Sequence, residues 1–231
     1  MDAYLQSLFT AFGFRKSHVA SLLLHIDTFE QAFTSREIDP TCNYEWLEQV
    51  GDTIHTAFIV YYFYERIPNL KTHYGQVIVS RLRIKYAARA QMVRFAETCG
   101  MWNFVRASDV SKMRNRDKLL EDVFEAFVGA LFVLGTRLHV NAHIFSNQFL
   151  KHIYDAEEFD LKRECLVDPI TRLKEWFDSH KNRALTFEVE NRGDFKHTIY
   201  LDGKVIGTGT AMKKKQAEWA AAEQAITWIE Q

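Results

Sequence analysis

The sequence of 231 residues contains little proline and glycine, few cysteines and no histidine cluster. It contains 3 Pro and 10 Gly, so few positions interrupt regular secondary structure. Its three Cys (Cys42, Cys99 and Cys165) lack metal-ligand spacing, and its nine His form no HxxxH or Cys/His cluster. These absences argue against a disulfide framework and a zinc site, and favour free thiols in a reducing compartment.

An excess of one charge and a long apolar run are also missing. The net charge is −1, so any nucleic-acid partner must be argued from local motifs rather than from bulk charge. No window reaches the roughly 18 apolar residues that span a membrane, and residues 1–14 lack the basic stretch of a secretory signal. We therefore expect a soluble, intracellular and cytoplasmic protein with no membrane partner. Its 47% hydrophobic content, with 18 Phe, predicts a sizeable core.

Apolar residues recur at three- and four-residue spacing through the first 155 residues. This periodicity predicts an all-helical domain over residues 1–155. The expected helices are Asp2–Phe12, Ser17–Thr34, Tyr44–Arg66, Gln76–Cys99, Leu119–Leu134 and Ala142–Tyr154. Pro68 and Asn69 are expected to separate the third helix from the fourth, and Gly100 to cap the fourth. The charged stretch that follows residue 155 predicts a linker over 156–167.

The pattern changes in residues 168–231. Asp168-Pro169 is typical of a helix start, and Asp202-Gly203 predicts a two-residue hairpin turn. Strand-like alternation appears at Leu185–Glu190, Lys196–Leu201 and Lys204–Thr210, and a last helix is expected over Lys213–Ile229. The predicted unit is a small α+β domain with the order α-β-β-β-α.

Two predicted helices carry acidic residues on faces that should be apolar. Glu45, Glu48 and Asp52 are spaced i, i+3, i+7, and Asp122 and Glu125 are spaced i, i+3 within an apolar segment. Few Lys or Arg lie on these faces, and buried acids are costly unless they are paired or bind a metal. Oxygen ligands favour a hard divalent cation, Mg²⁺ first and Mn²⁺ second, which suits phosphodiester hydrolysis. The alternative is that these acids are solvated surface residues.

The two acidic segments resemble those of the ribonuclease III family. The segment Glu45-Trp-Leu-Glu-Gln-Val-Gly-Asp52 is similar to the family signature, and Leu120–Ala130 is similar to its second acidic helix. Arg66–Leu70, Arg81–Arg83 and Phe95–Met101 also follow the family pattern. The resemblance implies an all-α catalytic domain, a homodimer, and double-stranded RNA cleavage that leaves 5′-phosphate and 3′-hydroxyl ends.

The same resemblance implies roles for individual residues. Glu48, Asp52, Asp122 and Glu125 would be metal ligands and catalytic residues, and Glu45 an accessory catalytic acid. Gln49 departs from the family pattern, because an aromatic residue that plugs the partner subunit usually stands there. A departure near Gln76, where the family often has an accessory Glu, implies an altered metal affinity.

Residues 168–231 resemble a double-stranded RNA-binding domain. The resemblance rests on three features: Gly207-Thr-Gly209, which we interpret as a loop, the three Lys that follow, and an Ala-rich helix. Cations at a helix N-terminus add to the positive end of the helix dipole, where phosphate binds well. The implied RNA-binding residues are Lys174, Glu175, Arg192, Lys196, Lys213, Lys214 and Lys215. The alternative is a solvated run of charges.

The basic segment Val105–Lys118 is open to two interpretations, a loop that guides the RNA backbone or a solvated loop. For the whole chain, the sequence predicts a Mg²⁺-dependent endoribonuclease specific for double-stranded RNA. The alternatives are a non-cleaving RNA-binding or assembly protein on the same scaffold, and a viral suppressor of RNA silencing that acts on short duplexes.

Overall fold

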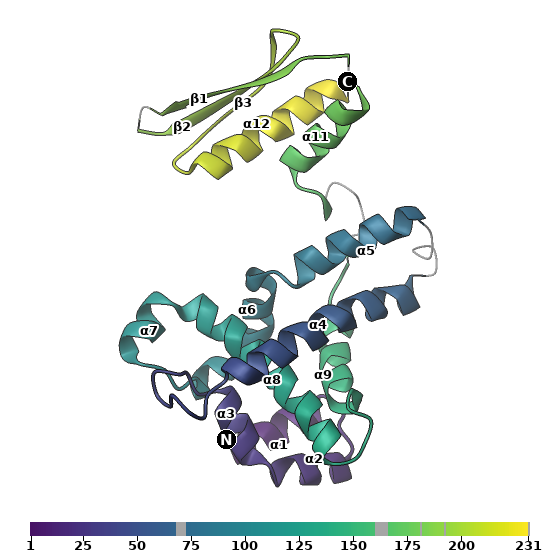
Figure 1. The fold of residues 1–231 in the computed structure, drawn as a ribbon, viewed down its shortest axis with the longest axis vertical. Coiled ribbons are helices and arrows are strands. Elements are labelled where there is room, and N and C mark those ends of the chain that lie inside the picture. The colour runs from purple at the N-terminus through teal and green to yellow at the C-terminus, as the bar shows by residue number, and fades with distance from the viewer. Residues whose placement is uncertain (68–72, 160–165, 181, 192, 231) are drawn as a thin grey trace. The chain divides into compact units, whose positions relative to one another are not determined.

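The computed structural model describes residues 1–67, 73–159, 166–180, 182–191 and 193–230, and Figure 1 shows its elements. The chain divides into two compact units, Met1–Phe159 and Asp160–Gln231. Residues 160–165 of the expected linker lie outside the described residues, as do Pro68 and Asn69. Within the described ranges, no helix combines the length and the apolar character that a bilayer crossing requires.

The first unit is built from helices, which confirms the predicted fold class. They are α1 (Asp2–Ala11), α2 (Lys16–Leu23), α3 (Ile26–Ala32), α4 (Glu45–Arg66), α5 (His73–Tyr86), α6 (Arg89–Thr98), the 3-10 helix η2 (Met101–Phe104), α7 (Asp109–Arg114), α8 (Arg116–Arg137) and α9 (Ile144–Asp155). Gly100 follows α6 in the left-handed conformation with φ 69°, as expected of a glycine cap.

Three predictions about these helices were wrong. The expected helix Ser17–Thr34 is divided into α2 and α3 at Leu24 and His25, and the expected helix Gln76–Cys99 is divided into α5 and α6 at Ala87 and Ala88. The apolar spacing continues across both breaks, and neither break contains Gly or Pro. The expected loop Val105–Lys118 contains α7, whose first turn is capped by the Ser108 hydroxyl.

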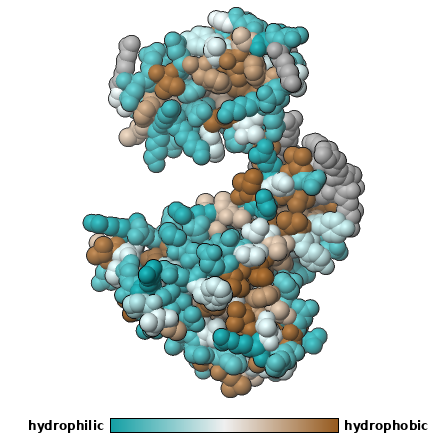
Figure 2. Space-filling model, viewed as in Figure 1, coloured by the Kyte–Doolittle hydropathy of each residue, from teal (hydrophilic) through white to brown (hydrophobic). Residues whose placement is uncertain are grey.

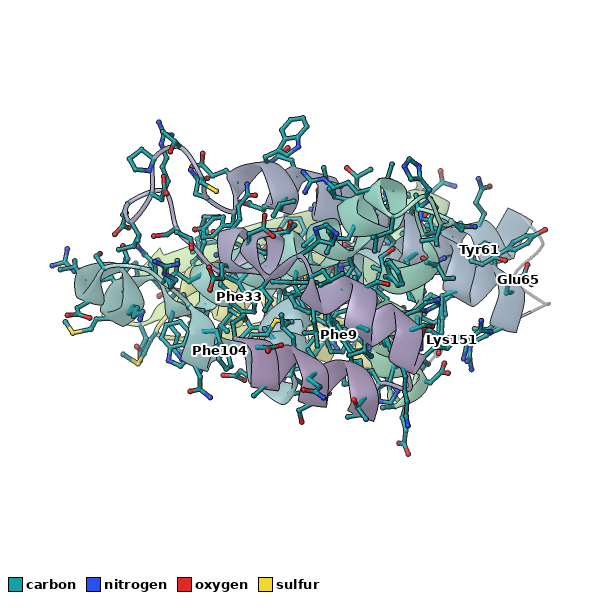
Figure 3. All side chains as sticks on the ribbon, turned by 90° about the horizontal axis from the view of Figure 1, so that it is seen from below. Phe9, Phe33, Tyr61, Glu65, Phe104 and Lys151 are labelled. Atoms are coloured by element: carbon teal, nitrogen blue, oxygen red, sulfur yellow. The ribbon has the colours of Figure 1, made fainter. Side chains whose placement is uncertain are left out.

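Helix α8 is the centre of the first unit. It is buried on almost every side, because residues from Leu119 to Gly135 point into α4, α6 and α9. An aromatic cluster surrounds its middle, with Phe127 in ring contact with Phe9, Phe29 and Phe33. Figure 3 shows Phe9 and Phe33 enclosed by helices, whereas Tyr61 lies toward the far end of α4.

The second unit has the predicted order. It consists of α11 (Pro169–Ser179), β1 (Leu185–Asn191), β2 (Phe195–Leu201), β3 (Lys204–Ala211) and α12 (Lys214–Ile229). The strands form an antiparallel sheet with the order β1-β2-β3. Asp168 caps α11 by accepting a hydrogen bond from the Thr171 amide at 3.1 Å. Asp202 and Gly203 have φ values of 52° and 80°, which confirms the expected two-residue hairpin turn.

Helices α11 and α12 pack together, and α12 covers β3 and β2. The core between them contains Leu173 of α11, Ile199 and Leu201 of β2, Ile206 of β3, and the alanines of α12. This small core holds the second unit together, since burial of apolar area is its main source of stability.

Candidate functional site

The site begins with two glycines that let α4 and α8 touch along their backbones. A Cβ at Gly51 would lie 1.7 Å from the carbonyl oxygen of Glu125, and a Cβ at Gly129 would lie 2.0 Å from that of Leu47. Real Cβ atoms are essentially never found within 3.0 Å of such an atom. The two acidic faces are therefore brought together by the absence of side chains at the helix crossing.

Three of the predicted ligands meet at this crossing. Carboxylate oxygens of Glu48, Asp122 and Glu125 all lie within 4.8 Å of one another. Asp122 is 3% exposed and Glu125 is 7% exposed, while Glu48 is half-buried. A partly buried group of oxygen donors at this spacing is the kind of ligand set that a hard divalent cation takes.

The other two predicted acids lie differently. Asp52 is exposed and lines the same pocket, but it is outside the group of three carboxylates. Glu45 is exposed, does not line the pocket, and lies 3.7 Å from the guanidinium of Arg36. On this geometry, Asp52 lies at the edge of the carboxylate group and Glu45 lies outside it.

The charges in this pocket perturb one another. Burial raises the pKa of Glu125 to about 8, and the negative charges of Asp52 and Glu121 add to the shift. Burial also raises the pKa of Glu48 to about 6, with the charge of Asp122 as the next cause. Both shifts mean that the ionised carboxylates are short of compensating positive charge, so the residues present fit a bound divalent cation.

One acid does have partners. The Lys118 ammonium donates to Asp122 Oδ1 at 2.8 Å, and the Tyr44 hydroxyl donates to Asp122 Oδ2 at 3.1 Å. The expectation that few bases neutralise these faces is therefore wrong for Asp122, because Lys118 stands one turn earlier on α8. For Glu48 and Glu125, in contrast, the described residues provide no ion pair or hydrogen bond to the carboxylate.

Sequence reasoning missed part of the pocket wall. The pocket is lined by Glu48, Gln49, Asp52, Ala87, Arg89, Met92, Lys118, Glu121, Asp122 and Glu125. Arg89 of α6 forms an ion pair with Glu121, which places a guanidinium at the rim. The i−4 spacing of Lys118 from Asp122, and of Glu121 from Glu125, is a signal that would have found two of these residues. Arg89 is distant in sequence and is placed only by the packing of α6 on α8.

In the second unit, the three predicted lysines gather where α12 begins. Lys213, Lys214 and Lys215 are all exposed, and the Lys215 ammonium lies 5.6 Å from the ring centroid of Trp219. No side chain caps this helix start, so its first amides stay available to an anion.

The remaining predicted RNA-binding residues lie on α11 and β2. Lys174 is exposed on α11, and Glu175 beside it is half-buried. The Lys196 ammonium lies 3.8 Å from Glu190 across the hairpin, in a pair that is exposed on both sides and therefore weak. Arg192 lies outside the described residues.

The structure corrects the interpretation of Gly207-Thr208-Gly209 as a loop. These residues lie inside β3, and both glycines face α12. A Cβ at Gly207 would lie 2.2 Å from the Ala221 carbonyl oxygen, and a Cβ at Gly209 would lie 2.1 Å from that of Ala217. The glycines and the Ala-rich helix are therefore a packing device, which sets α12 directly on the sheet and so positions the lysines at its start.

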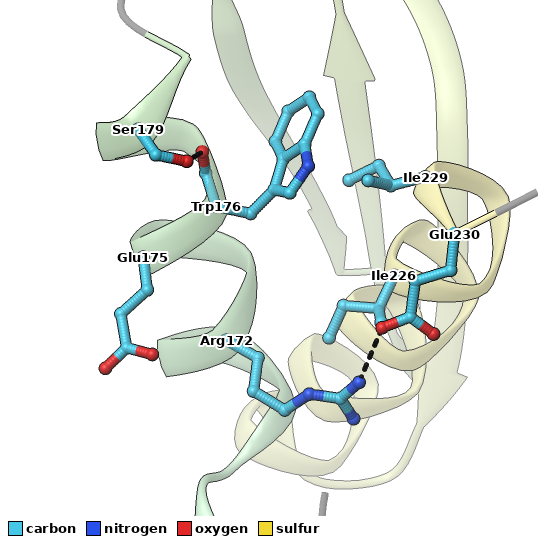
Figure 4. Close-up of a pocket in the computed structure, with 7 residues that line it drawn as sticks. All are labelled: Arg172, Glu175, Trp176, Ser179, Ile226, Ile229 and Glu230. Atoms are coloured by element: carbon cyan, nitrogen blue, oxygen red, sulfur yellow. Dashed lines mark hydrogen bonds and ion pairs between the residues drawn. The ribbon is translucent and has the colours of Figure 1, made fainter. Parts of the chain in front are cut away.

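A separate pocket of the second unit lies between α11 and α12 (Figure 4), with Trp176 and Ile226 among its walls. Arg172 closes one side through an ion pair with Glu230 at 2.9 Å, and the Ser179 hydroxyl donates to the Trp176 carbonyl. Glu175 borders this pocket. The ion pair joins α11 to Glu230, the residue that follows α12.

Comparison with known proteins agrees with this arrangement. Residues 45–135 match the Ribonuclease III domain family, and residues 169–229 match the double-stranded RNA binding motif family. The Ribonuclease 3 of Limosilactobacillus fermentum is 32% identical over 192 residues, covering 79% of this chain and 78% of that protein. A relative from Invertebrate iridescent virus 6 is 33% identical, covering 87% of this chain and 77% of the relative.

A relative from Frog virus 3 is 31% identical over 98% of this chain, yet the chain spans only 62% of that protein's length. Among solved structures, a ribonuclease III nuclease domain from Campylobacter jejuni superposes with a TM-score of 0.50 at 18% identity, covering 64% of this chain and 94% of that one. This likeness shows the fold of the first unit.

A helical unit with a partly buried carboxylate group, followed along the chain by a double-stranded RNA binding motif, defines the class of this protein as a nuclease that acts on RNA. More narrowly, the chain belongs to the ribonuclease III family.

Proposed function

We propose that this chain hydrolyses phosphodiester bonds of double-stranded RNA in a Mg²⁺-dependent reaction that leaves 5′-phosphate and 3′-hydroxyl ends. The observation that carries the proposal is the group of three carboxylates, Glu48, Asp122 and Glu125, with oxygens within 4.8 Å. A bound divalent cation supplies Lewis-acid activation of water and neutralises charge on the phosphate. Mn²⁺ prefers the same ligands and is expected to substitute.

The protein's own residues have distinct roles in this proposal. Glu48, Asp122 and Glu125 hold the cation, and Asp52 at the edge of the pocket adds negative charge that strengthens the hold. Lys118 and Tyr44 fix the orientation of the Asp122 carboxylate through their hydrogen bonds. Glu45, outside the pocket, is proposed as an accessory acid only.

The second unit is proposed to hold the duplex. Lys213, Lys214 and Lys215 contact phosphates, while Lys174, Glu175, Lys196 and Arg192 contact the backbone and the 2′-hydroxyls of the minor groove. We propose a catalytic domain over 1–155, a linker over 156–167 and an RNA-binding domain over 168–231. The division of the chain into units at Phe159 supports this organisation. We also propose a homodimer through the catalytic domain.

The test uses an end-labelled RNA duplex with the parent protein and two variants. Glu125→Gln removes a carboxylate from the group of three, and Glu65→Gln removes an exposed acid of the same pair of helices as a control. We expect cleavage by the parent and by Glu65→Gln in Mg²⁺ or Mn²⁺, none in EDTA, and a loss of at least about 100-fold for Glu125→Gln. Mass spectrometry of the products identifies their ends.

Binding is measured on the same samples by fluorescence anisotropy. Glu125→Gln is expected to bind the duplex as the parent does. If the parent binds tightly and cuts in neither metal, the enzymatic proposal is refuted and a non-cleaving RNA-binding protein explains the fold. Suppression of RNA silencing stays a prediction of the sequence alone.

A further inference from the structure

An arginine at the rim of the carboxylate pocket forms an ion pair with a largely buried acid. Arg89, the first residue of α6, donates through Nε to a carboxylate oxygen of Glu121 on α8. The Glu121 side chain is only 15% exposed, whereas that of Arg89 is 55% exposed. Both residues line the pocket that contains Glu48, Asp122 and Glu125. The pair therefore differs from an ordinary surface ion pair, in which both charges are solvated.

The bond to Glu121 leaves the outer edge of the guanidinium available. Nε is the only nitrogen of Arg89 that makes a hydrogen bond to another described residue. The donors on the two terminal nitrogens of a guanidinium form a planar fork, which can bind two oxygens of one phosphate. Because Glu121 holds Nε, this fork is oriented before a ligand arrives, and less entropy is lost on binding.

The two bases of the pocket have different partners. The pocket is lined by five acids and by two bases, Arg89 and Lys118. Lys118 is bonded to Asp122, one of the three carboxylates that converge. Arg89 is bonded instead to Glu121, which lies outside that group of three. Arg89 therefore lies beside the candidate cation site rather than in it.

The surroundings of Arg89 favour a negatively charged ligand. The first turn of α6 contains no acid and no side chain caps it, so the positive end of the helix dipole adds to the charge of Arg89. The surface where Figure 1 places α6 and the first turns of α4 is mostly hydrophilic in Figure 2. Phosphates follow one another along an RNA strand, so a strand with one phosphate at the cation presents the next phosphate at the rim.

We propose that Arg89, oriented by Glu121, binds an RNA phosphate adjacent to the scissile one, and that the same guanidinium weakens cation binding when RNA is absent. This inference rests on the proposed function, because it assumes that the scissile phosphate lies at the three carboxylates. Glu121 is a positioning residue, which contacts Arg89 and not the substrate. The positive charge of Arg89 attracts the phosphate and opposes the divalent cation, so its removal should change the two affinities in opposite directions.

A purely structural role for the pair would give a different result. The pair joins α6 to α8, and in that case it would serve only to fasten the two helices. Arg94 provides a matched control, because it lies on α6, is 52% exposed and forms an ion pair with Glu157. Arg94 does not line the pocket. Its substitution removes a comparable ion pair without changing the charge at the rim.

The first experiment measures the Mn²⁺ affinity of the full chain without RNA, by electron paramagnetic resonance of the free ion. The proteins are the parent, Arg89→Gln, Arg89→Lys and Arg94→Gln. We expect the Mn²⁺ dissociation constant of Arg89→Gln to fall by about 3-fold or more, since a unit charge about 10 Å from a divalent cation has an effect of this size in water. Arg89→Lys keeps the charge and Arg94→Gln leaves the rim unchanged, so both should bind Mn²⁺ as the parent does.

The second experiment combines protein variants with altered duplexes in a double-mutant cycle. A short duplex with one mapped cut site carries a neutral methylphosphonate at either phosphate next to the cut. On the unmodified duplex, we expect Arg89→Gln to lose about 10-fold or more in kcat/KM, the typical effect of losing a charge-assisted hydrogen bond. On the duplex that lacks the contacted charge, the parent and Arg89→Gln should be cut equally fast. Glu121→Gln should behave as Arg89→Gln does, and Arg94→Gln as the parent does.

The outcomes separate this inference from the proposed function. If Arg89→Gln binds Mn²⁺ no more tightly than the parent, or loses the same factor on all duplexes, the inference is overturned while cleavage by the parent stands. If Arg89→Gln and Arg94→Gln have the same effects, the pair only fastens α6 to α8. If the parent cuts no duplex, the proposed function fails and the phosphate contact fails with it. The Mn²⁺ affinities then decide by themselves whether Arg89 opposes the cation.

Discussion

Replacing Gly51 by Ala gives a demanding test of how the active site is assembled. In an ordinary helix interior this change is stabilising by about 1 kcal/mol, since Ala is a better helix former than Gly. Here the new Cβ would lie 1.7 Å from the Glu125 carbonyl oxygen, so α4 and α8 must move apart by more than an ångström. Overpacking typically costs about 1–3 kcal/mol, and a clash with backbone lies at the upper end of that range, at about 3 kcal/mol. We therefore expect a net destabilisation of about 2 kcal/mol.

The measurement is urea denaturation followed by circular dichroism, comparing the parent, Gly51→Ala and the exposed control Glu65→Ala. The same separation moves Glu48 away from Asp122 and Glu125, so the apparent affinity for Mn²⁺ should fall as well. A Gly51→Ala protein that is as stable as the parent, or more stable, would show that the crossing tolerates a side chain. Such a result would refute the idea that the close crossing of α4 and α8 at Gly51 brings the three carboxylates together.

Three further predictions address the charges and the second unit. Burial raises the pKa of Glu125 to about 8 and of Glu48 to about 6 from 4.5, so the folded protein binds these protons more tightly than the unfolded chain does. In EDTA, the stabilisation that these bound protons give the folded protein is fully present below about pH 4.5 and is lost as the pH rises through 6 and 8. The urea midpoint of unfolding should therefore fall between pH 5 and pH 9, and Glu125→Gln should make this fall smaller. Gly209→Val should displace α12 from β3 and cost about 3 kcal/mol in thermal melts of the second unit, whereas Thr210→Val should cost little. Lys214→Ala should reduce the slope of log affinity for duplex RNA against log salt by about 1, and an unchanged slope would contradict phosphate contact there.

Much of the fold follows from local signals. The Asp168 cap, the Asp202-Gly203 turn and the glycine after α6 depend on the conformations of a few adjacent residues, so the residue types alone predict them. The breaks inside Ser17–Thr34 and Gln76–Cys99 could not be predicted in this way. Their apolar spacing is continuous, and the chain turns there because the segments on both sides pack against the same core.

Part of the site could likewise be predicted from the sequence, and part depends on tertiary packing. The acids at Glu45, Glu48, Asp52, Asp122 and Glu125 could be identified from their helical spacing, which is a property of the chain itself. Which of them converge depends on the crossing of α4 and α8, and that crossing places three together, Asp52 at the edge and Glu45 outside.

The sequence by itself therefore determined the class of fold, the order of the two units and the residue types that carry the chemistry, because these follow from local propensity and periodicity. Only the tertiary structure decided that Lys118 compensates Asp122, that Arg89 reaches the rim, and that Gly207 and Gly209 pack α12 on the sheet. Each of these depends on distances between segments far apart in the chain, which the packing of helices sets and no local pattern encodes.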